Sequence, residues 1–138
     1  MILAFDYGTK KIGVASGNDL LGTATPLPAL PCKDTQPDWD RIDALLREWQ
    51  PDCLVVGLPL NMDGTSGARA QASRAFARNL AILGLPILLW DERWSTASAE
   101  RSMIAQDISR TKRAERIDSH AAAVILQAAI DRLAGGLF

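Results

Sequence analysis

The stretch ILAFDYGTKKIGVAS, residues 2–16, decides how the fold is interpreted. Ile2–Tyr7 is a nearly continuous apolar run that reaches a carboxylate at Asp6, which is typical of a buried strand ending at a sheet edge. Gly8–Lys10 supply a turn, and the alternating apolar residues of Lys11–Ser16 predict a second strand. Two strands joined by so short a link predict an antiparallel pair.

The chain continues this pattern and then changes period. Gly22–Leu27 predicts a third strand, ended by Pro26 and Pro28, which would complete an antiparallel meander. Apolar residues at helical spacing from Trp39 to Trp49 then predict a helix that has Pro37 in its first turn.

Two further strands and three further helices are expected. Cys53–Leu58 and Pro86–Trp90 are short apolar runs, as in strands covered on both faces. Right-handed crossovers would place both strands parallel to the first one. The predicted fold is therefore α/β, with a mixed five-stranded sheet (an antiparallel meander plus parallel strands) flanked by helices. The three helices are expected at Ser66–Gly84, with Ser66 as the cap, at Ser95–Gln106 and at Ile117–Leu133.

The composition limits the class of protein. The length of 138 residues predicts one domain, 1–138, and the 48% hydrophobic and 22% charged residues are typical of a globular chain. Fifteen basic against sixteen acidic residues give a net charge of −1, which argues against a strongly basic nucleic-acid coat protein. We expect no membrane span and no signal peptide, hence a cytoplasmic protein. Cys32 and Cys53 match no zinc or redox spacing.

Three acids are candidates for a catalytic metal site. Ligands of open sheets lie beyond the carboxyl ends of parallel strands, where Asp6 and Glu92 are expected, and Asp118 near the last helix could join them. Such carboxylates could hold two Mg²⁺ or Mn²⁺ ions that hydrolyse a phosphodiester. Each acid also has a structural interpretation: a turn for Asp6, a surface ion pair for Glu92 and a helix-start acid for Asp118. Asp91 competes with Glu92, and strand parity leaves that choice open.

Several cations are candidates for contacts with nucleic acid. Lys10 and Lys11 follow Asp6 within reach of a bound phosphate, and Arg69 and Arg74 lie near the start of a predicted helix. Solvated surface charge is the structural alternative for all of them. His120, the only histidine, could assist a proton transfer or be structural. A basic cluster near the C-terminus, also expected to contact phosphates, contains Arg110, Lys112, Arg113 and Arg116.

Four segments together resemble the YqgF family, also called RuvX, of Holliday junction resolvase-like nucleases. The resemblance implies an RNase H-like fold, a cytoplasmic location and a role in maturing the 5′ end of the 16S ribosomal RNA precursor. It also implies that Asp6, Glu92 and Asp118 are the acidic triad, which favours Glu92 over Asp91. Lys11 stands where the family often has arginine, and Trp94 where a smaller apolar residue is usual. In family order, the segments are Asp6–Ala15, Gly57–Thr65, Asp91–Thr96 and Ile117–Ala123.

The leading hypothesis is a metal-dependent nuclease that acts on RNA, with branched DNA as the second substrate, as a monomer or homodimer. A sugar-kinase-like or actin-like phosphate binder shares the Asp-x-Gly-Thr opening, but that class needs two domains closing over ATP. A non-catalytic nucleic-acid-binding assembly factor would keep the fold and the basic cluster without needing the acids.

Overall fold

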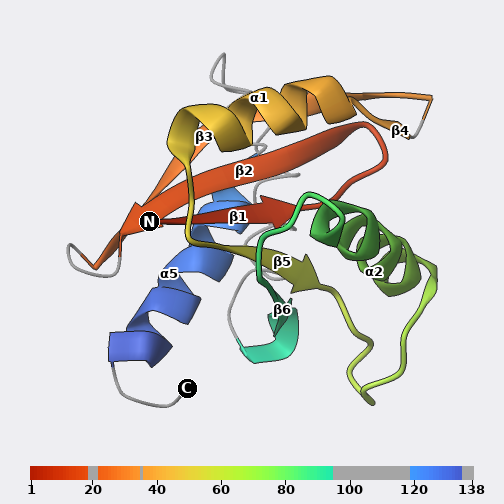
Figure 1. Ribbon diagram of the computed structural model, residues 1–138. Coiled ribbons are helices and arrows are strands. Elements are labelled where there is room, and N and C mark those ends of the chain that lie inside the picture. Colours follow the sequence, from red (N-terminus) through yellow and green to blue (C-terminus); the bar gives the residue numbers. More distant parts are fainter. Residues whose placement is uncertain (19–21, 35, 95–118, 135–138) are drawn as a thin grey trace, which may run out of the picture.

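The computed structural model describes residues 1–18, 22–34, 36–94 and 119–134 (Figure 1). Within these residues six strands form one mixed sheet in the order β4-β3-β2-β1-β5-β6. β1 is antiparallel to β2 and parallel to β5, and β6 is parallel to β5. The strands are β1 (Ile2–Asp6), β2 (Lys11–Asn18), β3 (Thr23–Lys33), β4 (Gln36–Pro37), β5 (Cys53–Leu58) and β6 (Ile87–Asp91).

The predicted plan of a meander followed by parallel strands is confirmed, with six strands in place of five. The additional strand is β4, whose two residues pair with Cys32 and Lys33 at the end of β3. The fold class is unaffected, because β4 only extends one edge of the sheet.

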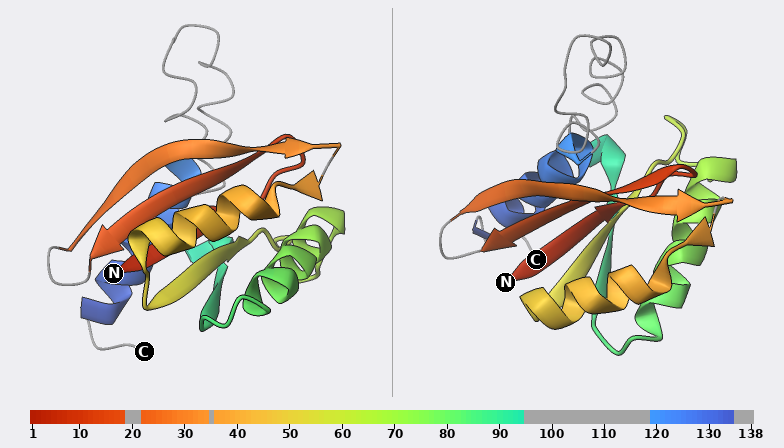
Figure 2. Two further views of the ribbon diagram at one scale, coloured as in Figure 1. Left: turned by 45° about the horizontal axis from the view of Figure 1, so that its top comes forward. Right: turned by 90° about the horizontal axis from the view of Figure 1, so that it is seen from above.

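Helices cover both faces of the sheet, as the two views in Figure 2 show. Helix α5 (His120–Ala134) lies on one face, whereas α1 (Trp39–Trp49) and α2 (Ala68–Ala81) lie on the other. None of the described helices is long and apolar enough to cross a membrane.

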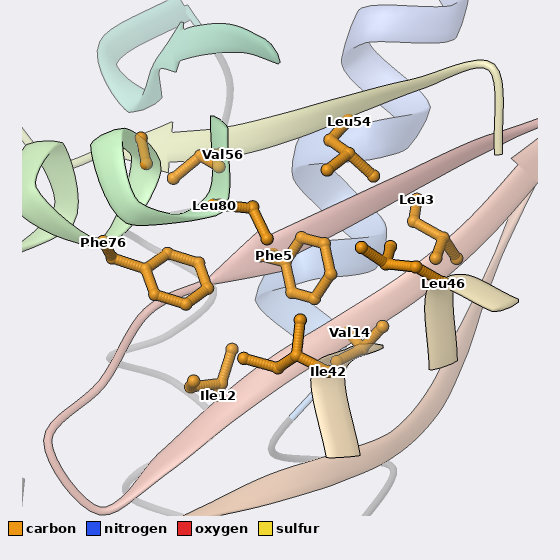
Figure 3. Packing of buried hydrophobic residues seen from close by; sticks show 11 residues of the cluster. Leu3, Phe5, Ile12, Val14, Ile42, Leu46, Leu54, Val56, Phe76 and Leu80 are labelled. Atoms are coloured by element: carbon orange, nitrogen blue, oxygen red, sulfur yellow. The ribbon is translucent and has the colours of Figure 1, made fainter. Parts of the chain in front are cut away.

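The side chains of β1 alternate between these two layers. Ile2 and Ala4 belong to the buried cluster under α5, whereas Leu3 and Phe5 belong to the cluster under α1 and α2. Figure 3 shows this second cluster, in which the ring of Phe5 lies among aliphatic side chains from the sheet and both helices. Because successive residues of a strand point to opposite faces, Asp6 is expected on the α5 face.

The predicted end of the third strand at Pro26 and Pro28 is wrong. β3 continues through both prolines to Lys33 and stays paired with β2, with a register irregularity between Ile12 and Val14. A strand with an unpaired outer edge can accommodate proline, and β3 pairs on its outer side only at its last two residues, with β4.

Two predicted helix starts are also wrong. Pro37 lies in β4, and α1 is capped by Asp38, whose side chain accepts a hydrogen bond from the Arg41 N–H at 3.2 Å. Ser66 does not cap α2, which begins after Gly67 without a side-chain cap. The helix predicted at 95–106 and residues 117–118 of the last helix lie outside the described residues.

Candidate active site

Asp6 and Glu92 lie at the same carboxyl end of the parallel strands, since Asp6 ends β1 and Glu92 directly follows β6. Asp6 ends β1, and its side chain is 11% exposed. Trp90 of β6 packs in the cluster under α5, and Glu92, two residues further on, begins the 3₁₀ turn η1 (Glu92–Trp94) with only 1% of its surface exposed. β5 lies between β1 and β6 in the sheet.

Gly57 of β5 makes room for the Glu92 carboxylate. A Cβ atom added at Gly57 would lie 3.2 Å from Glu92 Oε2 and 2.6 Å from Ile125 Cδ1 of α5. The pairing of Phe5 with Val56 makes Gly57 the next position beside Asp6. The Glu92 carboxylate therefore lies over Gly57, the position of β5 that comes next to Asp6 across the β1–β5 pair.

The neighbouring acid Asp91 is engaged elsewhere. Its carboxylate accepts hydrogen bonds from Arg93 N at 2.9 Å, Nε at 3.0 Å and Nη2 at 2.6 Å. These bonds lower the pKa of Asp91. Arg93 also reaches across to donate to the carbonyl of Met62 at 3.5 Å. Asp91 thus anchors the turn that carries Glu92 into the sheet edge.

The start of α5 is tied to the same edge. Ser119 is fully buried, and its Oγ accepts a hydrogen bond from the N–H of Val14 at 3.0 Å. Val14 adjoins Gly13, which pairs with Asp6 across the β1–β2 ladder. Asp118, the third predicted acid, directly precedes Ser119 in the sequence and lies outside the described residues.

Some of the predicted cations line a cleft beside Asp6, some lie elsewhere, and the rest lie outside the described residues. Arg69 Nη2 lies 3.9 Å from Asp6 Oδ1, and Arg69, Lys10 and Lys11 line one cleft of about 580 Å³ between the β1–β2 loop and α2. Arg74 is not among the residues that line it, and His120, half-buried, is the first residue of α5. The basic cluster lies outside the described residues: Arg110, Lys112, Arg113 and Arg116.

Among the described residues, no group of three His, Cys, Asp or Glu side chains is placed to hold a metal ion. The third predicted acid is not among those residues. The described part of the candidate site thus contains two carboxylates, buried Glu92 and the mostly buried Asp6, and Asp6 lies beside the cleft lined by cations.

Sequence reasoning missed two members of this arrangement. Gly57 interrupts the otherwise apolar Cys53–Leu58 run, and that interruption was a signal of close approach by another group. Ser119 carried no such signal, because its partner Val14 is 105 residues away in the sequence.

A family model described as "RuvX: Holliday junction resolvase" matches residues 1–132. The chain belongs to the RuvX family. A relative from Alcanivorax borkumensis is 58% identical over 129 residues, covering 92% of each chain, and bears the name "Putative pre-16S rRNA nuclease". A relative from Sphingopyxis alaskensis with the same name is 57% identical over 132 residues, which cover 96% of this chain and 87% of the relative.

Solved structures show the fold of this RuvX-family chain. RuvC of Thermus thermophilus in complex with a Holliday junction substrate matches with a TM-score of 0.56 at 15% identity, over 99% of this chain and 96% of that chain. A second RuvC structure from this organism gives a TM-score of 0.53 at 15% identity, covering 97% and 96%. The predicted RNase H-like fold and family resemblance are confirmed, and the chain is a nuclease of the hydrolase class.

Proposed function

We propose that this nuclease uses divalent metal ions to cleave precursor 16S ribosomal RNA and so processes its 5′ end. The names of its relatives support this substrate. The observation that carries the chemistry is the position of Glu92, whose buried carboxylate lies against Gly57 at the sheet edge where Asp6 ends β1. A role in ribosomal RNA processing implies a cytoplasmic enzyme.

The residues at this edge fit Mg²⁺ or Mn²⁺. Both ions prefer carboxylate oxygen ligands, which Asp6 and Glu92 supply, and water and substrate phosphate can complete the coordination. Asp118 is the third acid of the proposal. Its neighbour Ser119 accepts a hydrogen bond from the N–H of Val14, which follows the residue paired with Asp6 in β2. When bound, a pair of such ions neutralises phosphate charge and lowers the pKa of the attacking water.

Basic side chains beside the acids would hold the phosphates of the substrate. Arg69 lies at the limit of ion-pair distance from Asp6, so it can contact a phosphate without leaving the site. Lys10 and Lys11 line the same cleft and add positive charge that offsets the repulsion between the acids and the phosphate backbone. The burial of Glu92 keeps water away from one side of its carboxylate, and this strengthens its electrostatic interactions.

Cleavage of 5′-end-labelled precursor RNA tests the proposal. Asp6→Asn keeps the shape of the side chain and removes its charge, so we expect the rate to fall by about a hundredfold or more. Wild-type enzyme with the metal chelated should show the same loss. Asp43→Asn is the matched control, because Asp43 pairs with Arg47 on the surface of α1 and should leave cleavage unchanged. Cleavage by Asp6→Asn at the wild-type rate would rule out this site.

Branched DNA is the second candidate substrate, because the matching family model is described as a Holliday junction resolvase. The same acids would serve, since both substrates contain phosphodiesters. A four-way DNA junction assayed beside the precursor RNA separates the two: we expect the higher kcat/KM with RNA, and the reverse order would make DNA the substrate.

A further inference from the structure

The residues that line the cleft beside Asp6 are not ones that metal binding by the acids requires. Its walls are Tyr7 and the backbone of Gly8 and Thr9 on one side and the first turns of α2 on the other. Arg69 lines it and is also the residue 3.9 Å from Asp6, so the cleft opens directly beside the site proposed to cut the strand. We call this the Tyr7 cleft; its lining residues are Tyr7, Gly8, Thr9, Lys10, Lys11, Ala68, Arg69 and Ala72.

The chemistry of the Tyr7 cleft suits a nucleotide. An aromatic ring and the methyl groups of Ala68 and Ala72 provide an apolar wall, while Lys10, Lys11 and Arg69 provide three positive charges. No acidic side chain is among these lining residues. A base is a flat apolar group attached to an anionic phosphate, so it matches both parts of this surface.

The cleft is held open by packing on both sides of the β1–β2 loop. Phe76 of α2 stacks on Tyr7 with ring centroids 5.1 Å apart, and Trp39 stacks on Phe76 at 5.6 Å. Cys32 of β3 donates from its N–H to the Lys10 carbonyl at 2.8 Å and from its thiol to the Gly8 carbonyl at 3.5 Å. A preorganised cleft of this kind loses little entropy when a ligand binds.

The size of the Tyr7 cleft favours one nucleotide. Its volume of about 580 Å³ lies within the range of sites for small ligands. Unpaired RNA bases can leave the stack and bind aromatic side chains, whereas paired bases in an A-form helix present mainly backbone and groove edges. The occupant should therefore be an unpaired residue of the strand.

We infer that the Tyr7 cleft binds one unpaired nucleotide next to the scissile phosphodiester, with its base against Tyr7 and its phosphate at Arg69. This inference rests on the proposed function, since it takes the acids as the cleavage site. It makes the cleft the feature that selects single-stranded RNA over duplex RNA.

Filling the cleft tests the inference in a binding assay without metal. The probe is a fluorescently labelled single-stranded RNA oligonucleotide, compared with a blunt RNA duplex of the same length. Ala72→Leu places a larger side chain in the cleft, and Ala81→Leu, exposed at the far end of α2, is the matched control. We expect Ala72→Leu to weaken single-strand binding by roughly 5- to 150-fold, the loss of one base-stacking contact, and to leave duplex binding unchanged.

A second measurement needs no variant. RNA oligonucleotides that carry one abasic residue at successive positions should lose affinity for the wild-type protein when the abasic residue adjoins the cleaved bond. Equal affinity at every position, or equal losses of single-strand and duplex binding in Ala72→Leu, would overturn the inference. Because these readouts are made without metal, they stand apart from the Asp6→Asn cleavage test of the proposed function.

Discussion

Replacing Gly57 by alanine tests whether cleavage depends on the position of the Glu92 carboxylate. The new methyl group would lie 2.6 Å from Ile125 Cδ1 and 3.2 Å from Glu92 Oε2. Carbon atoms in contact prefer about 3.5–4.0 Å, so Ile125 must move by about 1 Å and Glu92 by less. Overpacking of this kind costs about 1–3 kcal/mol in the free energy of unfolding, which should lower Tm by roughly 3–10 °C in a chain of this size.

Gly17→Ala is the matched control for this variant. Gly17 lies in β2 under the same helix, and its added methyl group would lie 2.7 Å from Ile130 Cδ1 and 2.8 Å from Leu126 Cδ2. The steric strain against α5 is therefore similar. The three nearest described atoms to the Gly17 methyl all belong to Ile130 and Leu126, so this variant should lose stability without moving Glu92.

The assay pairs thermal unfolding, followed by circular dichroism, with cleavage of end-labelled precursor RNA well below the lower Tm. Gly57→Ala should reduce kcat by up to about tenfold, because Glu92 has to move by only a fraction of an ångström, whereas a full displacement of 1 Å can cost about a hundredfold. Gly17→Ala should cleave at nearly the wild-type rate. Equal activity of the two folded variants would refute the role given to Glu92, and an unchanged Tm for Gly57→Ala would refute the packing argument.

Three more predictions concern stability and binding. Ser119→Ala removes the buried acceptor of the Val14 N–H and should lower the free energy of unfolding in urea by about 1–3 kcal/mol. Ser73→Ala deletes a buried hydroxyl that has no hydrogen-bond partner among the described residues, so its stability should be unchanged or higher, and the opposite order of the two variants would contradict this. Arg93 lowers the pKa of Asp91, so the wild type should be more stable than Asp91→Asn at pH 7, and this difference in free energy of unfolding should shrink below about pH 4. A difference that does not change with pH would contradict the role of the Asp91–Arg93 pair. RNA binding should weaken with salt, and the slope of log binding constant against log salt concentration should flatten by about one unit for each neutralised residue of the basic cluster. An unchanged slope after all four are neutralised would exclude phosphate contacts by these residues: Arg110, Lys112, Arg113 and Arg116.

Much of the fold could be predicted from local pattern. Apolar alternation located β2, and nearly continuous apolar runs located β1, β5 and β6, because burial on one or both faces leaves its pattern in the sequence. The third strand was predicted too short, since proline is a local signal against strands. Whether a proline disrupts pairing depends on which edge of the strand is occupied, and β3 is paired on its outer edge only at its end.

The candidate site was predictable in part. Asp6 was located because it follows an apolar run, and Lys10, Lys11 and Arg69 were candidates by residue type. Their arrangement around one cleft depends on α2 packing beside the β1–β2 loop, a contact between segments some 60 residues apart in the sequence. No local pattern carries that information.

Residue periodicity and chain chirality were enough to predict every strand except β4, the parallel crossovers and the acids at two strand ends. Strand parity left the choice between Asp91 and Glu92 open and the family resemblance favoured Glu92, but only the packed structure gives the physical cause. Asp91 is held by Arg93, and Glu92 turns inward where Gly57 of the adjacent strand has no side chain. The physical reason is steric and non-local: the space for the carboxylate exists only after β5, β6 and α5 have packed together.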